Sequence, residues 1–258
     1  YPRVAQALRQ ARSAGIEFCA ATGRNAPAAR RILEGSQVEG WMIDLNGAEL
    51  RDPQGQIRAV QALDRELAER IMPKLRHPEV LTTIYSGELK YTFLPIEQHY
   101  QRYFIVPGCG KTPQNTPFSR FESDYRQLES LAELREPLFK IEMRSASLDA
   151  LHQIRSQLEN IPEIALTSAF THNLEVLPQT CNKASALKQL QKLLNLQREE
   201  IAVFGDDLND LCLFEQFPNS YAVANAKPEI LRRARTVIAA CEQQGPADVI
   251  TSFLERSV

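Results

Sequence analysis

Ile201-Ala202-Val203-Phe204-Gly205-Asp206-Asp207-Leu208-Asn209-Asp210 joins an apolar run to a tight group of acidic residues. The first four residues have the length and composition of a buried strand, which Gly205 ends. In an open α/β sheet, ligands bind beyond the carboxyl ends of the strands, where these acids would lie. Mg²⁺ suits such a group, because it binds one or two carboxylates together with waters and phosphate oxygens. The stretch therefore predicts an α/β sheet with a metal site at one strand tip.

A structural role is the alternative interpretation of the same acidic residues. Asp206 or Asp207 would cap the helix that follows the strand, and Asp210 would complement the dipole of that helix. Both interpretations place the acids between a strand and a helix.

Short apolar runs alternate with helical patterns on both sides of this stretch. Strands are predicted at 16–21, 40–45, 221–224 and 236–239, and helices at 4–11, 28–33 and 183–194. This alternation predicts a parallel, Rossmann-like sheet covered on both faces.

Residues 62–164 have a different character. They show helical patterns at 63–73, 124–134 and 148–158, and residues 139–143 alternate like a half-solvated antiparallel strand. We therefore predict an inserted α+β domain at 62–164 within a core formed by 1–61 and 165–258.

The composition favours small-molecule chemistry. The net charge of −2 provides no field for nucleic acid or an anionic membrane, and no apolar run approaches the ~20 residues of a membrane span. The 5 cysteines (19, 109, 181, 212 and 241) form no C-x-x-C pair, so we expect reduced, mostly buried thiols. The 4 histidines (77, 99, 152 and 172) show no metal-ligand spacing and are predicted to lie on the surface or in the insert. We expect a cytoplasmic monomer or weak homodimer that binds neither nucleic acid nor membrane.

Two further segments carry groups that bind anions. Thr22-Gly23-Arg24 offers a hydroxyl, an amide and a guanidinium at a strand tip, although a plain turn with a solvated arginine is the alternative. Lys183 lies in the first turn of a helix, where a cation opposes the helix dipole unless an anion offsets it; a solvated lysine is the alternative. Asn46-Gly47 is typical of a hairpin turn and equally compatible with a site.

Taken in order, T-G-R at 22–24, Lys183 and G-D-x-x-N-D at 205–210 resemble motifs two, three and four of the haloacid dehalogenase (HAD) superfamily. The chain is most similar to its Cof-like phosphatases, which carry a large α/β cap. The phrases at 43–48, 174–178 and 223–228 support the resemblance, which covers nearly the whole chain. It implies that the insert is a cap domain and that the protein is a Mg²⁺-dependent phosphoric monoester hydrolase acting on small phosphorylated metabolites, such as sugar phosphates.

The resemblance also implies a role for each site residue. Asp206 would ligate Mg²⁺ directly, Asp210 would hold a metal-bound water or Lys183, and Asn209 would fix the geometry. Thr22 and Lys183 would clamp the phosphoryl group with the amide of Gly23, and Arg24 and Asn46 would lie at the pocket mouth, toward the leaving group. Asp207 replaces a glycine common in the family, and we expect it to face solvent or cap the helix.

The first motif of the family, D-x-D-G-T, is absent from residues 1–258. The resemblance places its nucleophilic aspartate upstream of Tyr1, at the end of a central strand, and hydrolysis would proceed through an aspartyl-phosphate. We therefore expect the chain by itself to be inactive. The alternatives are a catalytically inactive HAD-like protein that binds a phosphorylated ligand and, less compatible with T-G-R, the phosphorylation domain of an ion pump.

Overall fold

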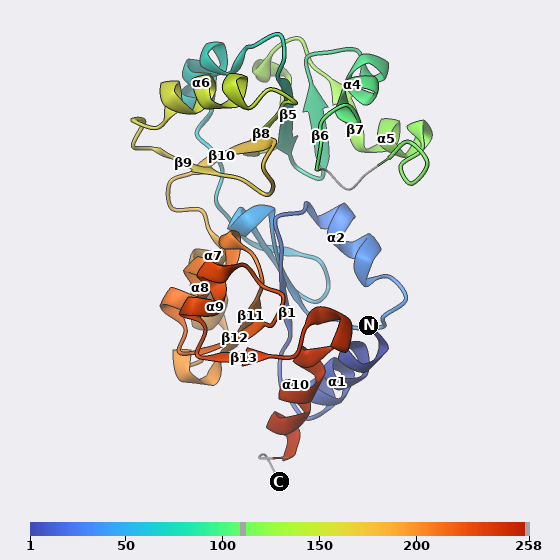
Figure 1. Ribbon diagram of the computed structural model, residues 1–258, viewed down its shortest axis with the longest axis vertical. Helices are drawn as coiled ribbons and strands as arrows, with labels where there is room; N and C mark the ends of the chain where they lie inside the picture. Colours follow the sequence, from blue (N-terminus) through green and yellow to red (C-terminus); the bar gives the residue numbers. More distant parts are fainter. Residues whose placement is uncertain (109–111, 256–258) are drawn as a thin grey trace. The chain divides into compact units, whose positions relative to one another are not determined.

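The computed structural model describes residues 1–108 and 112–255, and these divide into two compact units (Figure 1). Unit 1 comprises Tyr1–Val60 and Asn182–Val258, and unit 2 comprises Gln61–Cys181. No helix among the described residues has both the length and the apolar character that a bilayer crossing needs.

Unit 1 contains two sheets. The first has the order β1-β2-β3-β4, with β1 parallel to β2 and the other pairs antiparallel. The second, β11-β12-β13, is entirely parallel. The strands are β1 (Cys19–Ala21), β2 (Trp41–Asp44), β3 (Glu49–Arg51), β4 (Ile57–Val60), β11 (Ala202–Gly205), β12 (Asn219–Val223) and β13 (Thr236–Ile238). Within the described residues, β1 pairs with β2 alone and β11 with β12 alone, so each has one edge without a strand partner.

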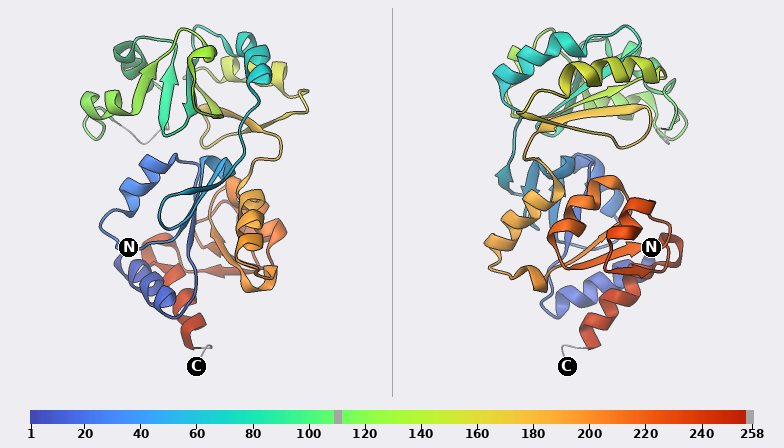
Figure 2. Two further views of the ribbon diagram at one scale, coloured as in Figure 1. Left: turned by 180° about the vertical axis from the view of Figure 1, so that it is seen from behind. Right: turned by 60° about the vertical axis from the view of Figure 1, so that its left-hand side comes forward.

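Helices and strands alternate along most of unit 1, which confirms the predicted α/β class. Leu187 and Leu190 of α7 belong to the same hydrophobic core as Ile43 and Val203. Helix α1 packs against α10 (Figure 2), and Ala7 and Ala247 lie in their shared core. The helices are α1 (Pro2–Ser13), α2 (Ala26–Leu33), α7 (Lys183–Leu193), α8 (Leu211–Gln216), α9 (Pro228–Arg233) and α10 (Gly245–Glu255). Short 3₁₀ turns are η1 (Leu45–Gly47), η4 (Arg198–Glu200), η5 (Leu208–Asp210) and η6 (Cys241–Gln243).

Unit 2 is built on a six-stranded sheet with the order β7-β6-β5-β8-β10-β9 (Figure 1). All neighbours are antiparallel except β6 and β7. The strands are β5 (Leu81–Ser86), β6 (Leu89–Thr92), β7 (Tyr125–Gln127), β8 (Leu138–Arg144), β9 (Ile164–Thr167) and β10 (Asn173–Pro178). The helices are α3 (Arg65–Ile71), η2 (Met72–Leu75), α4 (Ile96–Tyr103), α5 (Phe118–Asp124), η3 (Leu131–Glu133) and α6 (Leu148–Leu158).

The two faces of this sheet have opposite characters. Ile141 and Met143 of β8 join the apolar core with α3 and α6, represented by Ile71 and Ile154. Because side chains alternate along a strand, the residues between them lie on the other face. That face carries the charged side chains of β8, which are Lys140, Glu142 and Arg144.

The structure differs from the sequence expectations at three places in unit 2. Strand β10 pairs with β8 and β9 pairs with β10, so the second boundary lies at 181/182 rather than 164/165. The helix predicted at 124–134 is replaced by the end of α5, by β7 and by η3, because Tyr125–Gln127 pair with β6. Strand β8 is antiparallel as predicted, but every one of its residues is buried rather than half of them.

The thiols and histidines partly follow expectation. Cys181 is buried, and Cys19, Cys212 and Cys241 are partly buried; Cys109 lies outside the described residues. His99 is fully buried in unit 2, where its ring nitrogens contact Thr83 and Thr92.

Candidate active site

The turn after β1 is bonded to the loop after β2. The amide of Thr22 donates to the carbonyl of Ile43 (2.8 Å), and the amide of Leu45 donates to the carbonyl of Arg24 (2.9 Å). The hydroxyl of Thr22 accepts from the amide of Arg24 at 3.1 Å, which closes a tight turn. The Arg24 side chain is exposed and makes no hydrogen bond or ion pair with the described residues.

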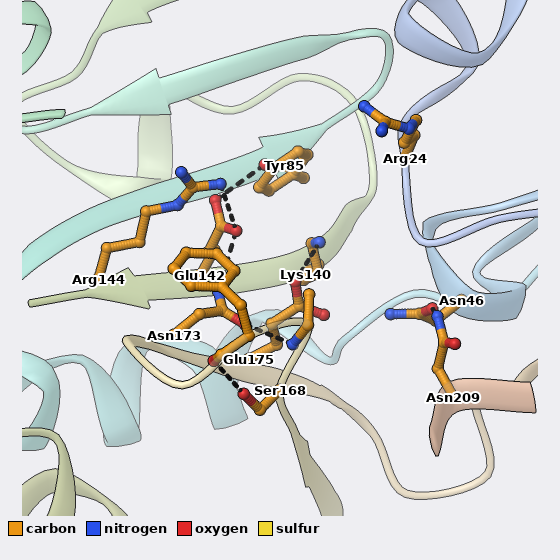
Figure 3. A network of polar contacts seen from close by, with 12 residues as sticks. Arg24, Asn46, Tyr85, Lys140, Glu142, Arg144, Ser168, Asn173, Glu175 and Asn209 are labelled. Atoms are coloured by element: carbon orange, nitrogen blue, oxygen red, sulfur yellow. Dashed lines mark hydrogen bonds and ion pairs between the residues drawn. The ribbon is translucent and has the colours of Figure 1, made fainter. Parts of the chain in front are cut away.

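Asn46 connects this turn to the acidic loop. Its amide donates to the carbonyl of Thr22 (2.9 Å), and its Oδ1 accepts from Nδ2 of Asn209 (3.0 Å; Figure 3). A Cβ on Gly23 would lie 2.9 Å from the same Oδ1, so a larger residue there would have to displace the Asn46 side chain. Asn46 has φ of 60°, a left-handed conformation that asparagine tolerates well. The hairpin interpretation of Asn46-Gly47 is confirmed, since the turn joins β2 to antiparallel β3, and the site interpretation stays a prediction.

Gly47 places the same loop against the start of α7. Its φ is 109°, and a Cβ there would lie 2.2 Å from the carbonyl oxygen of Asn182. Asn182 is the N-cap of α7, with its side chain accepting from the amide of Ser185. The close approach therefore fixes the position from which Lys183 extends.

Lys183 forms a buried ion pair with Asp210. Its Nζ lies 2.6 Å from Oδ1, and the two side chains are only 6% and 7% exposed. The other oxygen, Oδ2, accepts from the amides of Asp206 (3.0 Å) and Asp207 (3.2 Å). Both oxygens of Asp210 are therefore engaged by the chain itself, and the contact with Lys183 is one of the two contacts expected of this residue.

The two neighbouring aspartates have different surroundings. Asp207 accepts from the amide of Leu208 (2.6 Å) and pairs with Lys227 (2.5 Å), so it caps η5 as expected. Asp206 is exposed, and its carboxylate has no partner among residues 1–108 and 112–255. Partial burial, followed by the charges of Asp210 and Asp207, raises the pKa of Asp206. A bound cation would relieve this repulsion.

The donor set fits Mg²⁺ through one carboxylate. The described residues contain no group of three acidic, histidine or cysteine side chains placed to hold a metal. Mg²⁺ does not require such a group, since one or two carboxylates suffice when waters and phosphate oxygens complete the octahedron. Asp206 is the free carboxylate of this loop.

Contacts thus link most of the predicted site residues within unit 1. Hydrogen bonds, an ion pair or close approaches involve each of Thr22, Gly23, Asn46, Asn209, Asp210 and Lys183. Among the residues that position the site, Lys227 was not predicted from the sequence, and Gly47 was considered only as part of the Asn46-Gly47 turn. Both residues lie within stretches that support the family resemblance, 43–48 and 223–228. Their presence in these stretches was the sequence signal that could have identified them.

A buried ionic triad lies beside this loop. Asp44 and Glu49 face each other across β2 and β3, and Arg51 bonds both, at 3.3 and 2.8 Å. All three side chains are at most 6% exposed. Burial, followed by the charge of Glu49, raises the pKa of Asp44 to about 8, so one proton is retained among two carboxyls. Nothing in the sequence pattern indicated this triad.

Unit 2 holds a second polar network, on the charged face of its sheet (Figure 3). Glu142 is its centre, because it accepts from Tyr85 (3.0 Å), Arg144 (2.9 Å) and Asn173 (3.0 Å). Arg144 and Lys140 hold the pKa of Glu142 down, to about 2, against the desolvation that burial imposes.

Comparison with known proteins identifies the family to which the chain belongs. The family model described as haloacid dehalogenase-like hydrolase matches residues 2–250, so the chain belongs to that family. Within the HAD superfamily it is a member of the Cof-like group, with a Rossmann-like core and a cap, which confirms the resemblance stated above.

Individual relatives are moderately similar over most of their length. The chain is 28% identical to phosphatase YwpJ of Bacillus subtilis (strain 168), covering 96% of this chain and 91% of that protein. It is 26% identical to the HMP-PP phosphatase of Serratia proteamaculans, covering 98% and 88%. Among solved structures, a haloacid dehalogenase-like hydrolase from B. subtilis matches with a TM-score of 0.78 at 26% identity, covering 95% and 90%. One from Bacteroides thetaiotaomicron, at 19% identity, shares the fold with a TM-score of 0.80, covering 98% and 92%.

Proposed function

We propose that this protein is a Mg²⁺-dependent phosphatase that hydrolyses small phosphorylated metabolites, such as sugar phosphates. The observation that carries the proposal is the contact chain in unit 1, where a threonine turn, a buried lysine and an acidic loop are bonded together. The names of the phosphatase relatives support the same class of reaction.

The chain's own residues supply the phosphoryl clamp. Lys183 donates to the phosphoryl oxygens, and Asp210 positions its ammonium group through the buried pair. Thr22 and the amide of Gly23 donate from the turn after β1. Asn46, held by Asn209, and the exposed Arg24 contact the leaving group.

Asp206 would hold the metal. Mg²⁺ bound there neutralises charge on the transferring phosphoryl group. Asp210 was expected among the metal residues as well, and its engaged oxygens support an indirect role, in which it fixes Lys183 and the loop amides around Asp206.

The nucleophile is proposed to be an aspartate outside residues 1–258, and the route an aspartyl-phosphate. The absence of D-x-D-G-T from these residues motivates this part, together with the unpartnered edges of β1 and β11. Residues 1–258 alone are then inactive, because the remaining groups bind and orient the phosphoryl group without attacking it.

The test is phosphate release from a panel of sugar phosphates and phosphorylated cofactors. The protein is produced from its gene with any codons that precede Tyr1, and assayed with Mg²⁺ and with EDTA. We expect EDTA to abolish activity, and Asp206→Asn to lower it about 10²–10³-fold, the usual loss for an electrostatic clamp. Asp207→Asn is the matched control, because the Asp207 carboxylate caps η5 and pairs with Lys227, and its replacement should leave activity nearly unchanged. Turnover that survives both EDTA and Asp206→Asn would refute the metal role.

An inactive protein that binds a phosphorylated ligand is the second candidate, favoured by the lack of a nucleophile motif in residues 1–258. It predicts phosphate binding that depends on Lys183 but no turnover of any substrate in the panel. A location in the cytoplasm and a monomeric or weakly dimeric state stay predictions.

A further inference from the structure

Unit 2 contains a small pocket of about 180 Å³ that the proposed reaction does not use. It lies where the start of β5, the C-terminal end of α4 and the turn between β8 and α6 meet, and none of its lining residues belongs to unit 1. Pockets for drug-sized ligands occupy ~300–1,000 Å³, so this one suits a compact ion or group.

Arg144 lines this pocket and is held rigidly. Its Cζ lies 4.4 Å from the ring centroid of Tyr103 and 5.2 Å from that of Phe170, and its Nη2 donates to Glu142 (Figure 3). The side chain is only 10% exposed, yet Nε and Nη1 are buried without a hydrogen-bond partner in the described part of the chain. Unpaired buried donors are unfavourable, and an acceptor oxygen would satisfy them.

A second guanidinium lines the same pocket. Arg102 donates through Nη2 to the carbonyl of Pro78 (2.7 Å), and it forms no ion pair with any residue the structure describes. Its position is therefore fixed while its charge is not neutralised. The one acidic side chain in the lining is the exposed Glu79, so the two guanidinium groups outnumber it.

The turn between β8 and α6 adds backbone and hydroxyl groups. Ser147 lines the pocket and caps α6, a helix of 11 residues whose first amides are further donors. Asp149 in the first turn opposes an anion there, but it is exposed and screened. The nearby His99 has cationic surroundings as well: burial, opposed by the charge of Glu142 and reinforced by Arg144, Arg102 and Lys90, lowers the pKa of His99 to about 3.

We propose that this pocket binds a compact oxyanion, a phosphate or carboxylate group, through Arg144, Arg102 and the first turn of α6. The aromatic rings and Glu142 fix the conformation of Arg144 before binding, so little conformational entropy is lost when the ligand binds. Two sources share this chemistry, a free inorganic ion and an anionic group on a larger metabolite.

The test is a titration with inorganic phosphate in EDTA, followed by NMR of the ¹⁵N-labelled protein. The titration is carried out on the Lys183→Met/Asp210→Asn protein, which lacks the lysine of the proposed phosphoryl clamp in unit 1. We expect saturable shifts of the Ser147 and Leu148 amides in this background. Arg102→Gln should weaken binding about 10-fold or more, the usual loss for a charge-assisted hydrogen bond. Ala146→Glu, which places a second acid in the lining at an exposed position, should abolish it.

Arg120→Gln is the matched control, because Arg120 is an exposed arginine of α5 that does not line the pocket. An Arg102→Gln protein that binds phosphate as tightly as the Arg120→Gln protein overturns the proposal, as does a lack of shifts at the start of α6. Glycerol 3-phosphate and acetate, titrated in the same way, distinguish an esterified phosphate and a carboxylate from the free ion. Because no turnover is measured, failure of the phosphatase assay leaves this result independent.

Discussion

Replacing Lys183 by Met should destabilise unit 1 strongly. The change deletes the ammonium group 2.6 Å from Oδ1 of Asp210 and leaves a carboxylate whose side chain is only 7% exposed. Breaking a buried ion pair from one side typically costs about 3–5 kcal/mol, because the remaining charge has lost its partner and cannot reach water. The amides of Asp206 and Asp207 still bond Oδ2 and partly stabilise the remaining charge. We therefore expect a loss of unfolding free energy at the lower end of this range, about 3 kcal/mol.

The matched variant is the double substitution Lys183→Met/Asp210→Asn. It removes both charges, and the asparagine oxygen can still accept from the amides of Asp206 and Asp207. We expect it to recover most of the loss, since a buried pair and a neutral replacement of similar volume often have similar stability. The single variant should therefore be less stable than the double one, although it carries fewer changes.

The assay is urea unfolding followed by tryptophan fluorescence. The chain has 1 tryptophan, Trp41 in β2, so this signal reports on unit 1 alone. A loss of about 3 kcal/mol corresponds to a fall in Tm of roughly 6–12 °C for a protein of this size. If the Lys183→Met protein lost less than about 1 kcal/mol, the value of an exposed pair, the pair would not be the buried anchor described above.

Three further outcomes follow from the contacts. Gly47→Ala should destabilise unit 1 by at least ~1–3 kcal/mol, because it adds left-handed strain and a Cβ 2.2 Å from the Asn182 carbonyl oxygen; a thermal midpoint equal to the wild type would contradict this. Asn46→Ala should cost about 1–2 kcal/mol by removing the bond from Asn209 and placing alanine at φ 60°, measured by the same urea assay. His99 has a pKa of about 3 in the folded state and ~6.5 unfolded, so the unfolded chain binds the proton and stability falls as pH drops below about 6.5. Urea unfolding followed by circular dichroism should show about 2 kcal/mol less stability at about pH 5 than at pH 7 from this group, and an unchanged slope in His99→Gln would reject the assignment.

The strands of unit 1 could be predicted because their signal is local. Buried parallel strands read as short apolar runs, and glycine or a polar turn ends each one. The runs at 16–21, 40–45, 201–204 and 221–224 each contain or overlap an observed strand. The predicted and observed ends of these strands differ by at most three residues, because tertiary pairing rather than composition sets the last hydrogen bond.

Unit 2 was harder because pairing over long sequence distances defines it. Strands β9 and β10 lie close to the α/β residues in sequence, yet β10 pairs with β8 and β9 pairs with β10. This pairing moves the boundary to 181/182. Residues Tyr125–Gln127 continue a helical pattern in the sequence, but in the structure they pair with β6 and form a strand. The buried charges of β8 resemble a solvated strand by composition, and only the structure shows the partners that neutralise them.

At the candidate site, the sequence was sufficient to predict the residue types and their order, but not the contacts between them. The bond between Asn46 and Asn209 joins residues 163 positions apart, which no local pattern specifies. Both oxygens of Asp210 are engaged, which leaves Asp206 as the carboxylate without a partner in the described residues. This arrangement depends on the position of the first residue of α7 relative to η5.

The triad of Asp44, Glu49 and Arg51 makes the unfolding of unit 1 a proton-releasing reaction. At neutral pH the folded unit keeps a proton on Asp44, whose pKa is about 8, whereas an exposed aspartate with a pKa of ~3.9 gives it up. This group therefore contributes less stability as the pH rises from about 4 toward 8. The heat of unfolding near pH 7 must then include the heat of protonating the buffer, and it will differ between phosphate and Tris solutions of the same pH.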